Sequence, residues 1–146
     1  MILNCANCFR CCTHFIEDWR CPYLSENEAE RFKEFSTEIR LGDVNIQVLK
    51  PVNNRCPLWS YEDHCTRYDE RPMDCRLYPF MVKNGRIIVH LSCPDAVRML
   101  QLLVAGDSEA QAFFRQAEDI IMRASERYLR YLEWQSNGFK FYCVVE

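Results

Sequence analysis

Residues 5–12, CANCFRCC, place four cysteines within eight consecutive positions, at Cys5, Cys8, Cys11 and Cys12. Thiols spaced three residues apart on a short loop can all turn toward one point. Thiolates held that close repel one another, and a soft metal ion or an iron–sulfur cluster neutralises them. This stretch therefore predicts a metal-chelating loop around which the rest of the chain folds.

The chain has the size and composition of one folded domain. It has 146 residues, of which 49% are hydrophobic, so an apolar core can form without depending on metal alone. The formal net charge is −3 and no run of Lys or Arg occurs, so neither nucleic acid nor an anionic membrane is expected as a partner. We therefore expect a single cysteine-cluster domain over residues 1–146.

Ten cysteines suit either a secreted protein with disulfides or an intracellular protein that holds metal. Residues 1–4, MILN, run directly into Cys5 without the basic and apolar segments of a secretory signal. No segment approaches the ~20 consecutive apolar residues of a transmembrane helix. We expect a cytoplasmic protein with no membrane partner, whose cysteines are reduced and bind metal.

The later cysteines also have the local context of ligands. Cys21, Cys56 and Cys93 each precede a proline. Proline keeps the following turn out of a helix, and it also follows ligands in ferredoxin-type sequences. Adjacent residues in an extended chain point opposite ways, so Cys11 and Cys12 either serve two nearby centres or one of them is not a ligand. Two tetrahedral centres need eight ligands, and this number is met by Cys5, Cys8, Cys11, Cys12, Cys56, Cys65, Cys75 and Cys93. Which thiol belongs to which centre stays open.

Several arginines lie close in sequence to these cysteines, among them Arg55, Arg67 and Arg71. A centre bound by four thiolates carries net negative charge, which guanidinium groups can offset by donating to the sulfurs. The alternative is that they are surface residues paired with the neighbouring acids Glu62, Asp63, Asp69, Glu70 and Asp74.

Local signals predict both helix and strand in the first half of the chain. Ser25 and Glu28 have the spacing of a capping box, which predicts a helix from Glu26 to about Phe35. Apolar and polar residues then alternate over residues 38–50 on either side of Gly42-Asp43, which predicts a β-hairpin.

A second hairpin is predicted where residues 80–82 and 87–89, both strongly apolar, flank Asn84-Gly85. This dipeptide suits a type I′ turn because both of its residues tolerate a positive φ. Asp95 is expected to cap a short helix that ends near Leu103.

The C-terminal part carries a long helical pattern over residues 108–134, with Ser108 and Gln111 as a capping box, followed by a final strand over residues 139–145. The apolar stripe of this helix either covers a sheet or forms a dimer interface. The expected fold class is α+β, with small antiparallel β-hairpins and a long C-terminal helix packed around a cysteine-rich metal core.

The second cysteine block completes a pattern that resembles a known family. The block reads Cys56-Pro57-Leu58-Trp59, Cys65-Thr66-Arg67-Tyr68, Glu70-Arg71-Pro72 and Cys75-Arg76-Leu77-Tyr78-Pro79-Phe80. With the opening cysteines and Cys93-Pro94, it resembles the CxxCxxCC family, which is named for a zinc- or iron-chelating domain. The resemblance implies that the eight cysteines named above are ligands, and it leaves Cys21 and Cys143 as buried or free thiols outside this set.

The same domain is similar to the cysteine domain of flagellin lysine methylases. This similarity raises the hypothesis of an enzyme that transfers a methyl group from S-adenosylmethionine. The chain offers no Gly-rich loop after a strand, so no Rossmann-type methyltransferase site is visible, and no catalytic residue can be named. Whether the protein is an enzyme stays open.

Two cofactors fit the opening loop. Three thiols at three-residue spacing are typical of loops that hold a 4Fe-4S cluster, and zinc is the alternative because it binds the same thiolate sites. We therefore predict a metal-binding protein with one or two thiolate-ligated centres, in redox chemistry or metal handling. The alternatives are an iron–sulfur enzyme or subunit acting in protein methylation or oxidoreduction, and a structural zinc module that binds a partner protein through the C-terminal helix.

Overall fold

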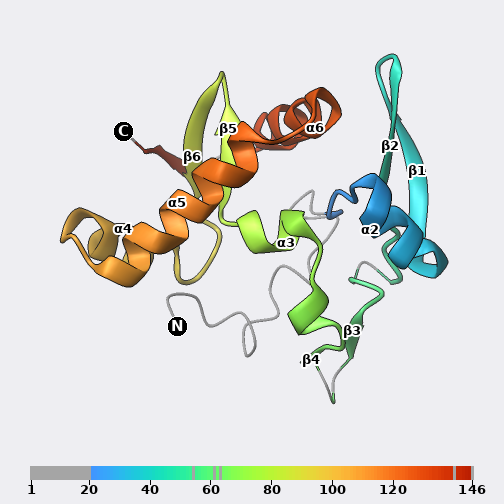
Figure 1. The fold of residues 1–146 in the computed structure, drawn as a ribbon, viewed down its shortest axis with the longest axis horizontal. Helices are drawn as coiled ribbons and strands as arrows, with labels where there is room; N and C mark the ends of the chain where they lie inside the picture. Colours follow the sequence, from blue (N-terminus) through green and yellow to red (C-terminus); the bar gives the residue numbers. More distant parts are fainter. Residues whose placement is uncertain (1–20, 54, 61, 63, 140, 146) are drawn as a thin grey trace. The chain divides into compact units, whose positions relative to one another are not determined.

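The computed structural model describes residues 21–145, apart from residues 54, 61, 63 and 140. The described residues form helices α2–α6 and small antiparallel sheets, which confirms the predicted mixture of helix and strand (Figure 1). They group into two compact units, which we call the N-terminal unit (residues 21–76) and the C-terminal unit (residues 77–145). The expectation of one domain stays a prediction.

The N-terminal unit begins with the predicted capping box. Helix α2 (Glu26–Arg31) starts after Ser25, whose hydroxyl accepts a hydrogen bond from the Glu28 N–H while the Glu28 carboxylate accepts one from the Ser25 N–H. The helix is shorter than predicted because the backbone leaves the helical conformation at Phe32, and a short 3-10 turn, η1 (Lys33–Phe35), follows. At this position the Phe32 ring, which is 1% exposed, is buried in the core of the unit.

The predicted first hairpin is present. Strands β1 (Ser36–Leu41) and β2 (Val44–Leu49) pair in antiparallel register, with Leu41 opposite Val44. Gly42 has φ +65° at the first turn position, where a two-residue type II′ turn favours glycine. The sequence therefore specified both the position of this turn and the residue that makes it possible.

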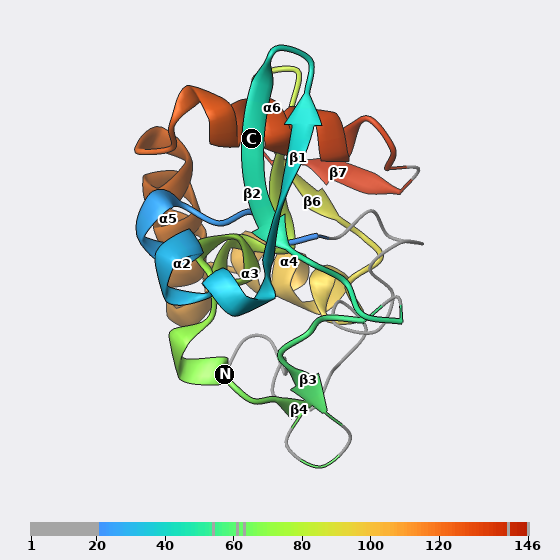
Figure 2. The ribbon, with the colours of Figure 1, turned by 90° about the vertical axis from the view of Figure 1, so that its right-hand side faces the viewer.

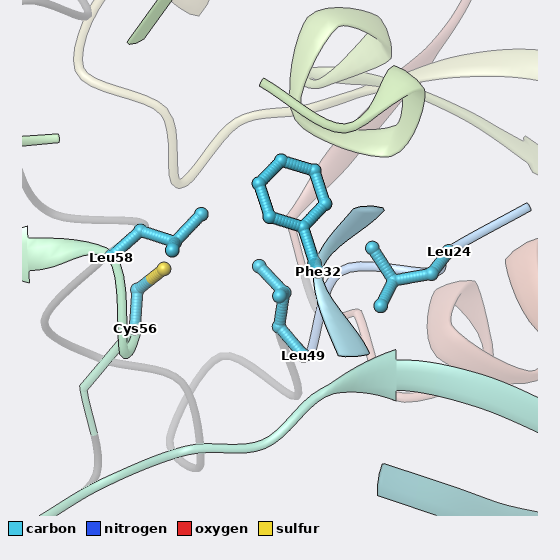
Figure 3. Packing of buried hydrophobic residues seen from close by; sticks show 5 residues of the cluster. All are labelled: Leu24, Phe32, Leu49, Cys56 and Leu58. Atoms are coloured by element: carbon cyan, nitrogen blue, oxygen red, sulfur yellow. The ribbon is translucent and has the colours of Figure 1, made fainter. Parts of the chain in front are cut away.

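A hydrophobic cluster forms the core of the N-terminal unit (Figure 3). It consists of Leu24, Phe32, Leu49, Cys56 and Leu58, all buried. Ala29, Phe35 and two further side chains, Cys21 and Trp59, pack against this cluster while remaining partly exposed. The cluster thus joins side chains from the start of the unit, from β2 and from the beginning of the second cysteine block.

The remainder of the N-terminal unit consists of short elements. Strands β3 (Trp59–Ser60) and β4 (His64–Cys65) form a small hairpin, followed by the 3-10 turn η2 (Tyr68–Glu70) and helix α3 (Met73–Leu77). These elements carry the second cysteine block.

The C-terminal unit contains a three-stranded antiparallel sheet in the order β5-β6-β7. Strands β5 (Phe80–Lys83) and β6 (Arg86–His90) form the predicted second hairpin, and Asn84 (φ +52°) and Gly85 (φ +74°) have the positive φ values of a type I′ turn. Strand β7 (Tyr142–Val144) pairs with β6 and lies at the edge of the sheet (Figure 2).

The predicted long C-terminal helix is wrong. The stretch forms two helices, α5 (Ser108–Met122) and α6 (Glu126–Ser136), after helix α4 (Ala96–Val104). The second helix starts anew because the Ser125 hydroxyl accepts a hydrogen bond from the Tyr128 N–H and the Ser125 backbone is extended (φ −67°, ψ 161°). The capping box at Ser108 is also wrong, since the Asp107 carboxylate caps α5 by accepting from the Ala110 N–H.

Helices α5 and α6 pack against the β5-β6 hairpin, in agreement with the interpretation that this part of the chain covers a sheet. The Phe80 ring of β5 contacts the rings of Phe113 and Phe114, with centroids 5.4 and 5.5 Å apart. The Ser136 hydroxyl of α6 donates to the Val82 C=O at 2.7 Å. None of the helices in the described residues combines the length and apolar character needed to cross a lipid bilayer.

Candidate metal centre

The predicted ligands fall into three groups. The four opening cysteines lie outside the described residues, and Cys93 belongs to the C-terminal unit. The N-terminal unit contains Cys56, Cys65 and Cys75. Across residues 21–145, with the four gaps noted above, no three His, Cys, Asp or Glu side chains gather in a group that could hold a metal ion. The predicted cysteine-rich metal core and the ligand assignment therefore stay predictions, and the described residues show how the second cysteine block is positioned.

Cys56 begins a tight turn and faces the hydrophobic cluster. Its C=O accepts a hydrogen bond from the Trp59 N–H at 3.1 Å, which closes a four-residue turn with Pro57 at the position where proline is favoured. The residue is 6% exposed, and its sulfur points toward Leu58 and Leu49 (Figure 3). Because the Cys56 side chain is buried in the hydrophobic cluster, packing fixes its position.

Cys65 lies on the strand that folds back beside this turn. It pairs with Trp59 across the β3-β4 hairpin. The following residue, Thr66, donates from its N–H and from its hydroxyl to the Leu58 C=O, at 2.7 and 2.8 Å. Cross-strand partners have Cα atoms ~4.5–5.5 Å apart, and the ends of a β-turn lie within ~7 Å. The hairpin therefore brings the segments of Cys56 and Cys65 together, although nine positions separate them in sequence.

Cys75 lies on α3, which two buried carboxylates hold in place. Asp74 Oδ2 accepts a hydrogen bond from the Tyr23 N–H at 2.9 Å, and Glu28 Oε2 accepts one from the Met73 N–H at 2.7 Å. Asp74 and Glu28 are 1% and 7% exposed, so these charge-assisted bonds are shielded from water. Asp74 is therefore a buried carboxylate that accepts a backbone hydrogen bond, and it is not a surface acid.

The segment that follows the opening cysteines is thereby tied to the second block. Leu24 donates from its N–H to the Gln47 C=O at 2.9 Å, and Leu49 donates to the Pro22 C=O at 3.0 Å, so this segment runs beside β2 and forms an isolated antiparallel bridge between Tyr23 and Val48. Cys21, at the start of the segment, packs against the cluster that contains Cys56. Residues far apart in sequence therefore meet within one compact unit.

Two of the arginines of the second block stack on aromatic rings. The Arg55 guanidinium lies 5.2 Å from the Trp59 ring centroid, and that of Arg71 lies 4.0 Å from the Tyr68 centroid. Arg71 also donates from Nε to the Tyr68 C=O at 3.0 Å. Arg67 forms an exposed ion pair with Glu70 at 3.8 Å, which confirms for this arginine the alternative of a surface residue paired with a neighbouring acid. Such cation–π contacts stiffen the irregular segments between the cysteines.

Cys93 occupies a turn in the C-terminal unit. It is 8% exposed, its N–H donates to the His90 C=O at 3.4 Å, and its C=O accepts from the Ala96 N–H at the start of α4. The His90 ring stacks on Phe139 with centroids 3.6 Å apart, and its Nδ1 forms a hydrogen bond with the Tyr78 hydroxyl at 2.8 Å. Buried aromatic packing therefore positions the turn that carries Cys93.

Sequence reasoning did not identify the positioning role of the two carboxylates. Glu28 was recognised as part of a capping box, but its bond to Met73 spans 45 positions and leaves no local signal. Asp74 is bonded to a residue 51 positions away. Cys21, which the resemblance leaves outside the ligand set, is half-buried beside the cluster, whereas Cys143 is exposed.

The donor chemistry of the N-terminal unit fits a soft metal. The cysteines of the second block offer sulfur, which zinc and iron–sulfur clusters prefer. Calcium and magnesium prefer oxygen ligands such as carboxylates. The buried carboxylates of Glu28 and Asp74 instead accept hydrogen bonds from backbone N–H groups.

Comparison with known proteins agrees with this chemistry. A family model named CxxCxxCC and described as a putative zinc- or iron-chelating domain matches residues 4–94, more than half of the chain and a range that includes all eight predicted ligands. No curated protein and no solved structure matches the chain. The relation to flagellin lysine methylases stays a prediction from sequence. The chain belongs to the CxxCxxCC family of putative zinc- or iron-chelating domains.

Proposed function

We propose that the chain holds a thiolate-ligated metal centre to which the opening cysteines and the second cysteine block both contribute. The observation that carries the proposal is the bonding of residues 21–28, which follow the opening cysteines, to the elements that carry the second block. The Tyr23 N–H bonds to Asp74 and the Glu28 carboxylate bonds to the Met73 N–H, and Met73 and Asp74 are the two residues directly before Cys75. The proposed ligands in this part of the chain are Cys5, Cys8, Cys11, Cys12, Cys56, Cys65 and Cys75.

Cys93 is the eighth ligand that the family resemblance implies. It belongs to the C-terminal unit, so its role is proposed from the sequence alone. A metal analysis of the Cys93 variant separates this assignment from that of the other cysteines.

We infer that a 4Fe-4S cluster is the native cofactor and that zinc is the alternative. The spacing of Cys5, Cys8 and Cys11 supports the cluster, as does the proline that follows Cys56. When bound, a cluster supplies one-electron transfer. The protein holds the ligand segments rigid and excludes water beside Cys56, which strengthens the interaction between thiolate and metal. A redox or metal-handling role in a reducing, cytoplasmic setting follows from this proposal.

The decisive experiment is metal and sulfide analysis of protein purified without oxygen. We expect brown protein with broad absorption near ~400 nm and iron and sulfide in roughly equal amounts. Colourless protein with about two zinc ions per chain would support the zinc alternative and reject the cluster. Folded protein without any bound metal would refute the proposed centre.

Cysteine substitutions test the ligand assignment. Cys56→Ser, Cys65→Ser and Cys75→Ser should each lower the metal content per folded chain by about half or more, because serine is a poor ligand for soft metals. Cys143→Ser is the matched control, since Cys143 is exposed and lies on β7 in the C-terminal unit. Circular dichroism of each variant separates loss of metal from loss of fold. Equal metal content in Cys56→Ser and Cys143→Ser would contradict the assignment.

A further inference from the structure

Strand β7 lies at the edge of the C-terminal sheet in the part of the chain that the structure describes. It is the outer strand of the β5-β6-β7 sheet, and among the described residues no strand pairs with its other side. We propose that this edge pairs with β7 of a second copy of the chain, in antiparallel orientation and with Cys143 on the two-fold axis. This inference is independent of the metal centre.

The exposed side chains of the strand are apolar. Phe141 is 67% exposed, Tyr142 38% and Val144 42%. Natural sheet edges are commonly protected by charged residues, by proline or by covering elements, and residues 141–145, FYCVV, contain neither charge nor proline. Pairing this segment with itself therefore brings no like charges together.

The backbone geometry sets which groups are available for pairing. The Phe141 C=O accepts from the Leu91 N–H, and the Val145 N–H donates to the Ile87 C=O, both at 3.0 Å. In an antiparallel ladder the N–H and C=O of one residue point to the same side, and successive residues alternate. Residues 141, 143 and 145 are therefore directed toward β6, while Tyr142 and Val144 direct their N–H and C=O groups toward the open edge.

A two-fold axis at Cys143 satisfies these groups. It sets Tyr142 opposite Val144 of the second copy, and the two such pairs exchange four hydrogen bonds. Pairs of an aromatic and a β-branched residue are favourable across strands. The same register sets Phe141 opposite Val145, again an aromatic and a β-branched residue.

The proposed dimer is weak and reversible. A strand of three residues is too short for the ~1,200–2,000 Å² that stable interfaces bury. The register sets the two Cys143 residues as a non-hydrogen-bonded pair, with Cα atoms ~4.5 Å apart and within the range of a disulfide. Diamide can therefore trap the dimer: the two thiols lose two protons and two electrons to form the S–S bond, and diamide gains them to become the hydrazine.

Sedimentation of the full chain with matched variants tests the proposal. Wild-type protein, kept reduced, should shift from monomer to dimer as its concentration rises toward hundreds of micromolar. Val144→Pro removes an N–H that points away from β6, so the dissociation constant should rise roughly tenfold or more while the sheet is kept. Val144→Thr keeps the N–H and the β-branched shape, and it should dimerise like the wild type. Monomer at every concentration, or equal dimerisation of the proline and threonine variants, would overturn the proposal.

Diamide treatment followed by peptide mapping tests the register. The expected product is a dimer whose crosslink joins Cys143 to Cys143, and Cys143→Ser should abolish this product while retaining the reversible dimer. A crosslinked dimer that survives in Cys143→Ser in equal yield would place the contact elsewhere and refute the two-fold axis at Cys143.

Discussion

Replacing Glu28 with alanine should destabilise the N-terminal unit by about 2–4 kcal/mol, because one side chain holds two backbone groups. Its carboxylate accepts the Met73 N–H at 2.7 Å and the Ser25 N–H at 3.0 Å, and the residue is 7% exposed. A buried hydrogen bond to a charged group contributes ~1.5–3 kcal/mol, and the capping interaction adds ~0.5–1 kcal/mol, which together give about 2–4 kcal/mol. Alanine also leaves the Met73 N–H without this acceptor.

Amide hydrogen exchange in the native state measures this effect. The Leu49 N–H is a suitable reporter, because it donates to the Pro22 C=O at 3.0 Å and is not itself bonded to Glu28. If Leu49 exchanges through opening of the whole unit, its protection should fall roughly 30- to 800-fold in Glu28→Ala. Glu28→Gln should show an intermediate loss, because the amide retains one acceptor oxygen.

Glu30→Ala on the same helix is the control. Glu30 is exposed, so its substitution should change the free energy of unfolding by less than ~0.5 kcal/mol. If Glu28→Ala and Glu30→Ala leave the Leu49 amide equally protected, the buried carboxylate does not join the capping box to α3, and the reasoning is refuted.

Three further substitutions test the fold. Leu49→Ala removes a fully buried side chain from the hydrophobic cluster and should cost ~2–5 kcal/mol in urea unfolding of the N-terminal unit; a loss below ~1 kcal/mol would contradict the packing. Gly85→Ala places a Cβ at φ +74° and should cost ~1–2 kcal/mol, seen as a lower Tm, whereas an unchanged Tm would argue against the type I′ turn. Asp107→Ala should cost ~1 kcal/mol and Ser108→Ala clearly less; the reverse order in thermal unfolding would restore Ser108 as the cap of α5.

Local patterns predicted the local elements well. The capping box at Ser25 and Glu28 and the turn at Asn84-Gly85 are present as the sequence indicates. Each depends on residues within a few positions of one another, so the chemistry of the turn or cap is visible in the sequence itself. The same reasoning failed at Ser125, because an apolar stripe that continues through residues 108–134 hides a serine that starts a new helix.

The amino-acid sequence by itself determined the family, the grouping of the cysteines into two blocks along the chain and the positions of the β1-β2 and β5-β6 hairpins, since spacing and turn chemistry are local properties. Only the tertiary structure decided that Asp74 and Glu28 are buried and bonded across 51 and 45 positions, and that Cys21 packs beside the cluster containing Cys56. The physical reason is that a buried carboxylate takes whichever backbone N–H the packed chain brings to it, and no periodicity in the sequence encodes that partner. The position of β7 at the edge of its sheet, where no other described strand pairs with it, is likewise a property of the assembled sheet, because the same apolar segment would be covered if another strand lay beside it.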